Sequence, residues 1–170
     1  KATIAGGTVN GAAAGAEIQN AAAIGTVEKN TLTVTDGTVN GDSYGGITYG
    51  TGDAVQNGAV VSGGSTNLSN VYGGSAASGS ATKNYVTFAD ASAQSITAGR
   101  TGGAGAVSDN KVEMTSGSSA NGVTGGLSYG SGTVSGNKVE IKGGTVGGNI
   151  LGGQNIGTGA ASSNTVELTG

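Results

Sequence analysis

One residue type recurs along this chain at an almost constant spacing. Asparagine stands at Asn30, Asn57, Asn84, Asn110, Asn137 and Asn164, so successive members are 26 or 27 residues apart, and each is followed by a short segment of alternating apolar and outward residues. A fixed period of about 20 to 50 residues is typical of proteins built from stacked repeats. The spacing therefore predicts a solenoid, which is a scaffold that many functions share.

The residues between the asparagines predict the parts of one coil. After each asparagine, and also at 2–4, two apolar residues flank one that points outward, as in a strand with one buried face. The segments are 2–4, 32–34, 59–61, 86–88, 112–114, 139–141 and 166–168. A Gly-rich corner and a second short strand follow, and then a third strand that ends in paired small residues, as at Gly73 and Gly74. The closing arc carries one small apolar residue three positions before each asparagine, namely Val27, Ala54, Ala81, Val107, Val134 and Ala161.

Together these segments predict an all-β protein, a parallel β-solenoid of about six coils of ~27 residues with three short strands per coil. The whole chain, 1–170, is one solenoid segment with repeats at 1–30, 31–57, 58–84, 85–110, 111–137 and 138–164 and a partial seventh at 165–170. The first repeat departs from the pattern, because the alanine-rich stretch 11–24 predicts a loop, a short helical turn or a looser coil. Because 165–170 repeats the phase of 1–6, we expect a fragment of a longer chain or a subunit that stacks end to end.

Composition argues against several other classes of protein. Val, Ile, Leu and Phe make up less than about a fifth of the chain, as in disordered proteins, but the net charge is only -3 and the apolar positions are regular. Thirty-seven glycines disfavour helices. Seven basic residues scattered among ten acidic ones predict no nucleic-acid partner, and no apolar run is long enough for membrane insertion by this segment.

The repeat blocks resemble a known class of proteins. Gly-Gly-Thr-Val-Asn-Gly at 6–11, Val-Tyr-Gly-Gly at 71–74 and the strands of the type Asn-x-Val-x-Ile are similar to the Gly-rich repeats of bacterial autotransporter and haemagglutinin-like adhesin passengers. The resemblance covers the whole chain as a repeat type. It implies a right-handed β-helix that is extracellular or displayed on the bacterial outer cell surface.

Three sets of residues are candidates for special roles. The six asparagines predict a structural ladder of stacked amides. Glu113, Glu140 and Glu167 share an outward column, with Lys111 and Lys138 two residues before the first two, so lysine pairing or a bridging cation would offset their repulsion. Four tyrosines are possible surface contacts, Tyr44 and Tyr72 at one corner and Tyr49 and Tyr129 at another. As outward aromatic residues they could bind carbohydrate or a neighbouring rod.

The leading functional hypothesis is a non-enzymatic structural and adhesive rod, either a passenger stalk or a filament-forming surface protein. It would bind a host surface or a glycan, or associate with itself end to end or laterally. The alternative is a glycan- or cation-binding module, and more remote ones are a polysaccharide-active enzyme and an ice-binding protein. With no His, no Cys and a single arginine, we expect no catalytic residue, no cofactor and no metal site.

Overall fold

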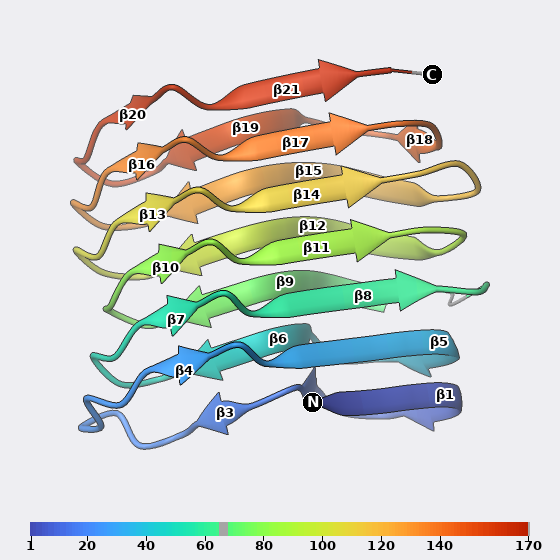
Figure 1. The fold of residues 1–170 in the computed structure, drawn as a ribbon, viewed down its shortest axis with the longest axis horizontal. Helices are drawn as coiled ribbons and strands as arrows, with labels where there is room; N and C mark the ends of the chain where they lie inside the picture. The colour runs from blue at the N-terminus through green and yellow to red at the C-terminus, as the bar shows by residue number, and fades with distance from the viewer. Residues whose placement is uncertain (65–67, 170) are drawn as a thin grey trace.

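The computed structural model describes residues 1–64 and 68–169, and this part of the chain contains β-strands and no helix. The chain winds into about six coils that lie on one another, with β1 (Ala2–Val9) at one end of the stack and β21 (Thr165–Leu168) at the other (Figure 1). Each full coil contributes to three parallel sheets, called A, B and C below. The predicted parallel β-solenoid is therefore confirmed.

Sheet A begins directly after the asparagines. Between β1 and β21 it contains β5 (Thr31–Val39), β8 (Gly58–Ser62), β11 (Tyr85–Phe88), β14 (Lys111–Met114) and β17 (Lys138–Ile141). Its register places equivalent residues of neighbouring coils opposite one another, for example Leu32 beside Ala59. In β1 and β5 the strand continues past the Gly-rich corner that the sequence analysis placed after the first strand.

Sheets B and C complete each coil. Sheet B contains β2 (Ala13–Ala14), β3 (Glu17–Ile18), β6 (Ser43–Thr48), β9 (Leu68–Ala76), β12 (Ser92–Thr101), β15 (Ser119–Ser128), β18 (Thr145–Val146) and β19 (Ile150–Asn155). Sheet C contains the two-residue strands β4 (Val27–Glu28), β7 (Ala54–Val55), β10 (Ala81–Thr82), β13 (Val107–Ser108), β16 (Val134–Ser135) and β20 (Ala161–Ser162).

The number of strands per coil agrees with the prediction, but their division along the chain differs. The second and third predicted strands form one continuous strand in β9, β12 and β15, and the closing arc supplies the third strand as sheet C. The Gly-Gly pairs therefore lie inside the strands of sheet B and not at a corner. Gly73 and Gly74, for example, do not have positive φ, so their small size and not their backbone freedom explains them.

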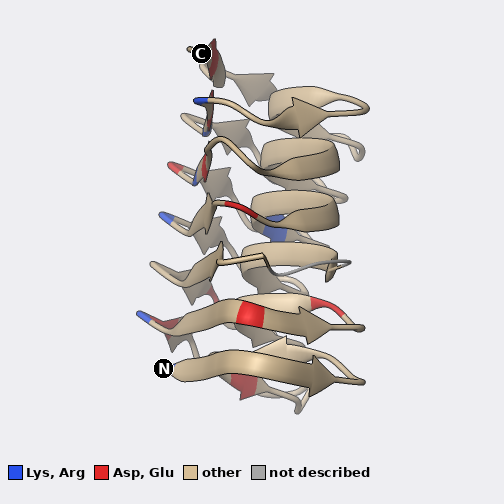
Figure 2. Ribbon diagram, turned by 90° about the vertical axis from the view of Figure 1, so that its right-hand side faces the viewer, with Lys and Arg blue, Asp and Glu red and all other residues tan. Residues whose placement is uncertain are grey.

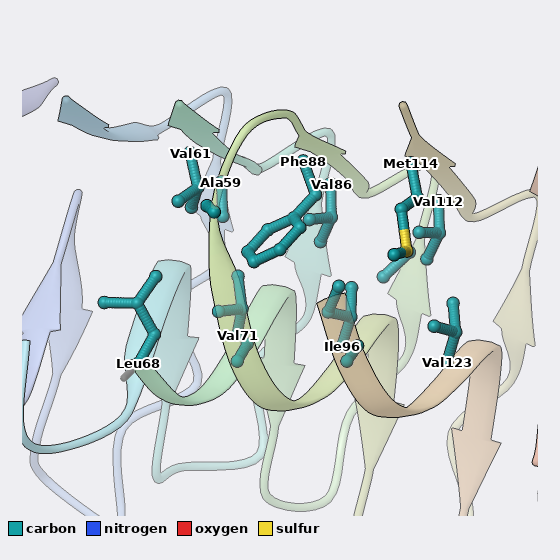
Figure 3. Close-up of a cluster of buried hydrophobic side chains, with 14 of the residues drawn as sticks. Ala59, Val61, Leu68, Val71, Val86, Phe88, Ile96, Val112, Met114 and Val123 are labelled. Atoms are coloured by element: carbon teal, nitrogen blue, oxygen red, sulfur yellow. The ribbon is translucent and has the colours of Figure 1, made fainter. Parts of the chain in front are cut away.

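The core lies between sheets A and B. Figure 3 shows Leu68, Val71, Ile96 and Val123 of sheet B facing a second row of apolar side chains from sheet A, made of Ala59, Val61, Val86, Phe88, Val112 and Met114. All ten are at most 1% exposed. Each coil inserts only a few side chains, and neighbouring coils cover them, which is how a chain with so few large apolar residues buries a continuous core.

The first coil is a looser version of the others and contains no helical turn. Its alanine-rich stretch forms β2 and β3, and both pair with β6 of the next coil. The register sets Ala14 beside Tyr44 and Glu17 beside Ile47, so Gly15 and Ala16 stand where the second coil has its Gly-Gly pair. Of the three possibilities for this stretch, the structure shows the looser coil.

Candidate functional site

The six asparagines lie between sheets C and A and form a hydrogen-bonded row through the stack, called the asparagine ladder below. Each Nδ2 donates to the Oδ1 of the next asparagine along the chain, at 2.8–3.2 Å. The same Oδ1 accepts the backbone N–H of the preceding asparagine, at 2.8–3.1 Å. From Asn57 on, Nδ2 also donates to a carbonyl 29 or 30 residues earlier, at 2.9–3.0 Å. The four central amides are buried and hydrogen-bonded, so they are structural groups and not ligand contacts.

Glycine on sheet B makes room for the ladder. A Cβ at Gly46, Gly74, Gly99, Gly126 or Gly153 would lie 2.2–2.5 Å from an atom of the asparagine amide beside it. The sequence analysis noticed both columns but not that the second glycine of each pair faces an asparagine. The two columns form one unit, because the amide fills the volume that a side chain on the neighbouring wall would need.

The strained residue of the adjoining turn precedes the asparagine. Positive φ values of 54–66° occur one position before the asparagines and not at the asparagines themselves, namely at Lys29, Gln56, Lys83, Asp109, Gly136 and Ser163. Only one of these residues is glycine, although side chains are disfavoured in the left-handed region. The tight turn before each asparagine is therefore held by the hydrogen bonds around it rather than by the local residue type.

The glutamate column lies on the outer face of sheet A and is neutralised by lysines. Lys111 Nζ lies 2.9 Å from Glu140 and 3.3 Å from Glu113, while Lys138 Nζ lies 2.6 Å from Glu140 and 3.0 Å from Glu167. Lys142, which the sequence analysis did not single out, adds contacts of 2.8 Å to Glu113 and 3.4 Å to Glu140. Lysines thus occupy the positions between the carboxylates. No group of three or more His, Cys, Asp or Glu among the described residues could hold a metal ion.

Glu140 is the centre of this network. Its side chain is 13% exposed, and hydrogen bonds from Lys138 and Lys111 lower its pKa from 4.5 to about 2. Hydrogen bonds from Lys142 and Lys111 lower the pKa of Glu113. A carboxylate with a lowered pKa in the folded state stabilises the fold above its unfolded-state pKa, and this contribution disappears as the pH falls through the folded-state pKa.

We therefore expect acid to weaken the wild-type chain through Glu140 between about pH 4.5 and pH 2. Glu140→Gln should lower the free energy of unfolding at neutral pH by about 1 kcal/mol, allowing for solvent screening, and should flatten its pH dependence in that window. Urea denaturation followed by circular dichroism at several pH values measures both. Glu28→Gln is the matched control, because Glu28 pairs with the exposed Lys29 and with no other cation of the described residues. This substitution should cost a few tenths of a kcal/mol at most. An unchanged pH profile in Glu140→Gln would contradict the assignment.

The four candidate tyrosines lie in or directly after strands of sheet B, on its outer side, and two of them are buried. Tyr44 and Tyr72 lie within β6 and β9, not at a corner, and are only 7% and 9% exposed. Their rings stack with centroids 5.0 Å apart and planes 10° apart. Burial, followed by the Asp42 carboxylate that accepts the Tyr44 hydroxyl at 3.0 Å, raises the pKa of Tyr44. The expected corner position is therefore wrong for this pair, although both side chains are on the outer face as expected, where neighbouring residues cover them.

Tyr49 and Tyr129 are the exposed pair, each 46% exposed. They follow β6 and β15 at equivalent positions, and the intervening coils carry Ala77 and Gly102 there. Because two coils with small residues at this position separate them, the two tyrosines are three coils apart and do not stack on each other.

Arg100 connects the buried and exposed tyrosines, and the sequence analysis missed this role. It lies in β12 with Cζ 5.5 Å from the ring centroid of Tyr72 and 5.2 Å from that of Tyr129. Tyr44, Tyr72, Arg100 and Tyr129 come from four successive coils and are called the tyrosine–arginine column below. Little in the sequence indicates this column. Residues 47, 75, 100 and 127 occupy equivalent positions, but this becomes evident only when the strands are paired.

The two larger hollows on the described surface lie near sheet B. The larger, about 260 Å³, is lined by Leu68, Ser92, Ala93, Gln94, Ser119 and Asn121, which include no ionisable or aromatic side chain. The second, about 150 Å³, lies beside the tyrosine–arginine column and includes Tyr49, Ala77 and Arg100 in its lining. The second hollow combines aromatic rings with a positive charge, which makes it the stronger candidate of the two for recognition.

Figure 2 shows charged residues along the left edge of the stack and only a few on the face toward the viewer. No helix among the described residues is long and apolar enough to cross a membrane. Comparisons with protein-family models, with curated proteins and with solved structures each found no match for this chain. The geometry of the solenoid itself is therefore what supports a function.

Proposed function

We propose that this chain is a non-enzymatic structural rod that makes contact with a surface or with other copies of itself, as a stalk or a filament-forming segment. The observation that carries the proposal is the uninterrupted stack. Inward apolar columns and the asparagine ladder run through successive coils, and the residues that the structure describes contain no inserted domain. The interior holds the coils together, so contact with another molecule is left to the outward columns and to the two ends of the stack.

The outward columns favour adhesion or self-association over the other hypotheses. The glutamates are paired with lysines, which gives little support to a cation-binding module. Thr33 aligns with Val60, Thr87 and then Glu113, so this column does not form the continuous threonine array expected for ice binding. We place the rod outside the cell or on the bacterial outer surface, in keeping with the adhesin-like repeat type.

The proposal is tested by the shape and the contacts of the purified chain. Electron microscopy and sedimentation over a range of concentrations should show rods that lengthen into uniform fibres if the chain associates end to end. Beads coated with the chain should be retained on cell layers or polysaccharide films more than beads coated with albumin. Short monodisperse rods that are retained on no surface would contradict the proposal.

A further inference from the structure

The hollow beside the tyrosine–arginine column is an open groove. It is lined by Tyr44, Ile47 and Tyr49 of the second coil, by Ser75 and Ala77 of the third, and by Arg100 of the fourth, and this set is called the Tyr49 groove below. Ala77 and Gly102 leave space between Tyr49 and Tyr129 because they fill little of it. Three coil spacings, roughly 14 Å, separate those two tyrosines along the rod axis. The groove therefore suits an extended ligand that lies along the rod.

Arg100 gives this groove a positive charge. It is the only arginine of the chain, and no carboxylate of the described residues lies within ion-pair distance of it, whereas Lys29, Lys111, Lys138 and Lys142 all have such partners. Its guanidinium is held between the rings of Tyr72 and Tyr129. A guanidinium that is fixed by stacking keeps N–H donors at its edge, where they can bind a carboxylate in a bidentate manner.

Acidic residues nearby make the two ends of the groove differ in charge. Asp42 lies at the other end of the column and accepts hydrogen bonds from the Tyr44 hydroxyl at 3.0 Å and from Asn70 Nδ2 at 2.9 Å. Glu17 borders the small neighbouring hollow of about 40 Å³, on the other side of Tyr44, Ile47 and Tyr49. A negative group is therefore attracted to the Arg100 end and repelled from the Asp42 and Glu17 end.

We propose that the Tyr49 groove binds an acidic oligosaccharide of the hexuronate class, with Arg100 paired to a sugar carboxylate and the exposed Tyr49 ring packed on the face of a pyranose. Aromatic rings pack well on the C–H face of a sugar, because the ring is apolar and its π face is negative. This inference rests on the proposed function, since it names what the rod contacts.

Other occupants fit the groove less well. Nucleic acid requires several cations to neutralise its phosphates, and one arginine with Asp42 and Glu17 nearby does not provide them. A neutral glycan would use the tyrosines but leave the charge of Arg100 without a partner. An acidic peptide would use Arg100 but not the flat exposed ring of Tyr49. A chain of identical acidic sugar rings uses both.

The test uses a matched pair of ligands, a short oligogalacturonate and its fully methyl-esterified form. The two have the same rings and differ in charge. Saturation-transfer NMR and calorimetric titration with the whole chain should show binding of the acid and affinity that is about tenfold or more lower for the ester. Saturation should be transferred from tyrosine protons to the sugar.

The variants separate the charge from the ring. Arg100→Gln should weaken acid binding about tenfold or more and leave ester binding nearly unchanged, whereas Lys83→Gln removes an equal charge outside the groove and should change neither. Tyr49→Ala should weaken both ligands, and Tyr49→Phe should weaken neither, because only the ring is required. Tyr49 is nearly half exposed, so its variants report on binding even if Arg100→Gln disturbs the stacking.

Several results would overturn the inference. These are equal affinity for acid and ester, no difference between Arg100→Gln and Lys83→Gln, or binding of an oligoglutamate but not of the oligogalacturonate. Fibre formation and bead retention on cell layers are measured without this ligand, so the rod function can stand when the groove assignment fails. A failure of both bead retention and fibre formation would instead remove the proposed function itself.

Discussion

Asn110→Ala is expected to lower the free energy of unfolding by about 3 kcal/mol or more. The change removes the Oδ1 that accepts the backbone N–H of Asn84 at 2.8 Å and its Nδ2 at 3.0 Å. It also removes the Nδ2 that donates to the Ala81 carbonyl at 2.9 Å. The same Nδ2 donates to Asn137 Oδ1 at 2.8 Å, so four polar groups each lose a hydrogen-bond partner. The site is 0–1% exposed, and water cannot replace the lost partners easily.

Chemical denaturation followed by circular dichroism measures this loss, and hydrogen exchange locates it. The backbone N–H of Asn84 should exchange faster in the variant than in the wild type. Asn30→Ala is the control, because Asn30 is only partly buried and its Nδ2 donates to Glu28 of its own coil. We expect a cost of about 1 kcal/mol there. Equal losses in the two variants would show that burial of the ladder does not matter.

Gly99→Ala should be nearly as damaging, at about 2 to 3 kcal/mol, although it adds only one methyl group. The added Cβ would lie 2.3 Å from Cγ of Asn110, so the amide must move out of its hydrogen bonds or the strand must shift. Gly122→Ala in β15 is the matched control, since the nearest atom to its added Cβ is 3.8 Å away. That variant should remain within about 0.5 kcal/mol of the wild type.

The two positions should be coupled. In the Asn110→Ala background the methyl group of Gly99→Ala has room, so its cost should fall by about 2 kcal/mol relative to the wild-type background. Denaturation of the two single variants and the double variant measures this coupling. Additive costs would mean that Gly99 is required for a reason other than the asparagine beside it.

The winding of the chain was predictable because it depends on repeated residues. The 26- or 27-residue spacing set the coils and their register, and alternation identified the inward positions of sheet A, such as Val86 and Phe88. Sheet C was harder to predict, since a strand of two residues such as β10 leaves little pattern. Ser43 also breaks the inward column of Val71 and Ile96, and its buried hydroxyl has no hydrogen-bond partner among the described residues.

The contacts on the outer surface depend on residues that occur once. Arg100 is a single arginine between strands whose equivalent residues are Ser75 and Leu127, so no repeat marks it. Its neighbours Tyr72 and Tyr129 are 28 and 29 residues away in the sequence. Likewise, the spacing showed the asparagines and the glycines as separate columns, and only the coil geometry brings Asn110 against Gly99. Columns that repeat from coil to coil were visible in the sequence, whereas contacts between columns and features of a single coil needed the structure.

The asparagine ladder also gives the rod a chemical sense. In the bonds between asparagines, Nδ2 always donates toward the following coil and Oδ1 always accepts from the preceding one. The row therefore begins with the Oδ1 of Asn30 as an acceptor and ends with the backbone N–H of Asn164 as a donor. Two copies that meet in the same orientation can continue the row, because an acceptor then faces a donor. Opposed copies would bring like groups together. A polymer formed through these layers would therefore be polar, with two unlike tips that add subunits at different rates.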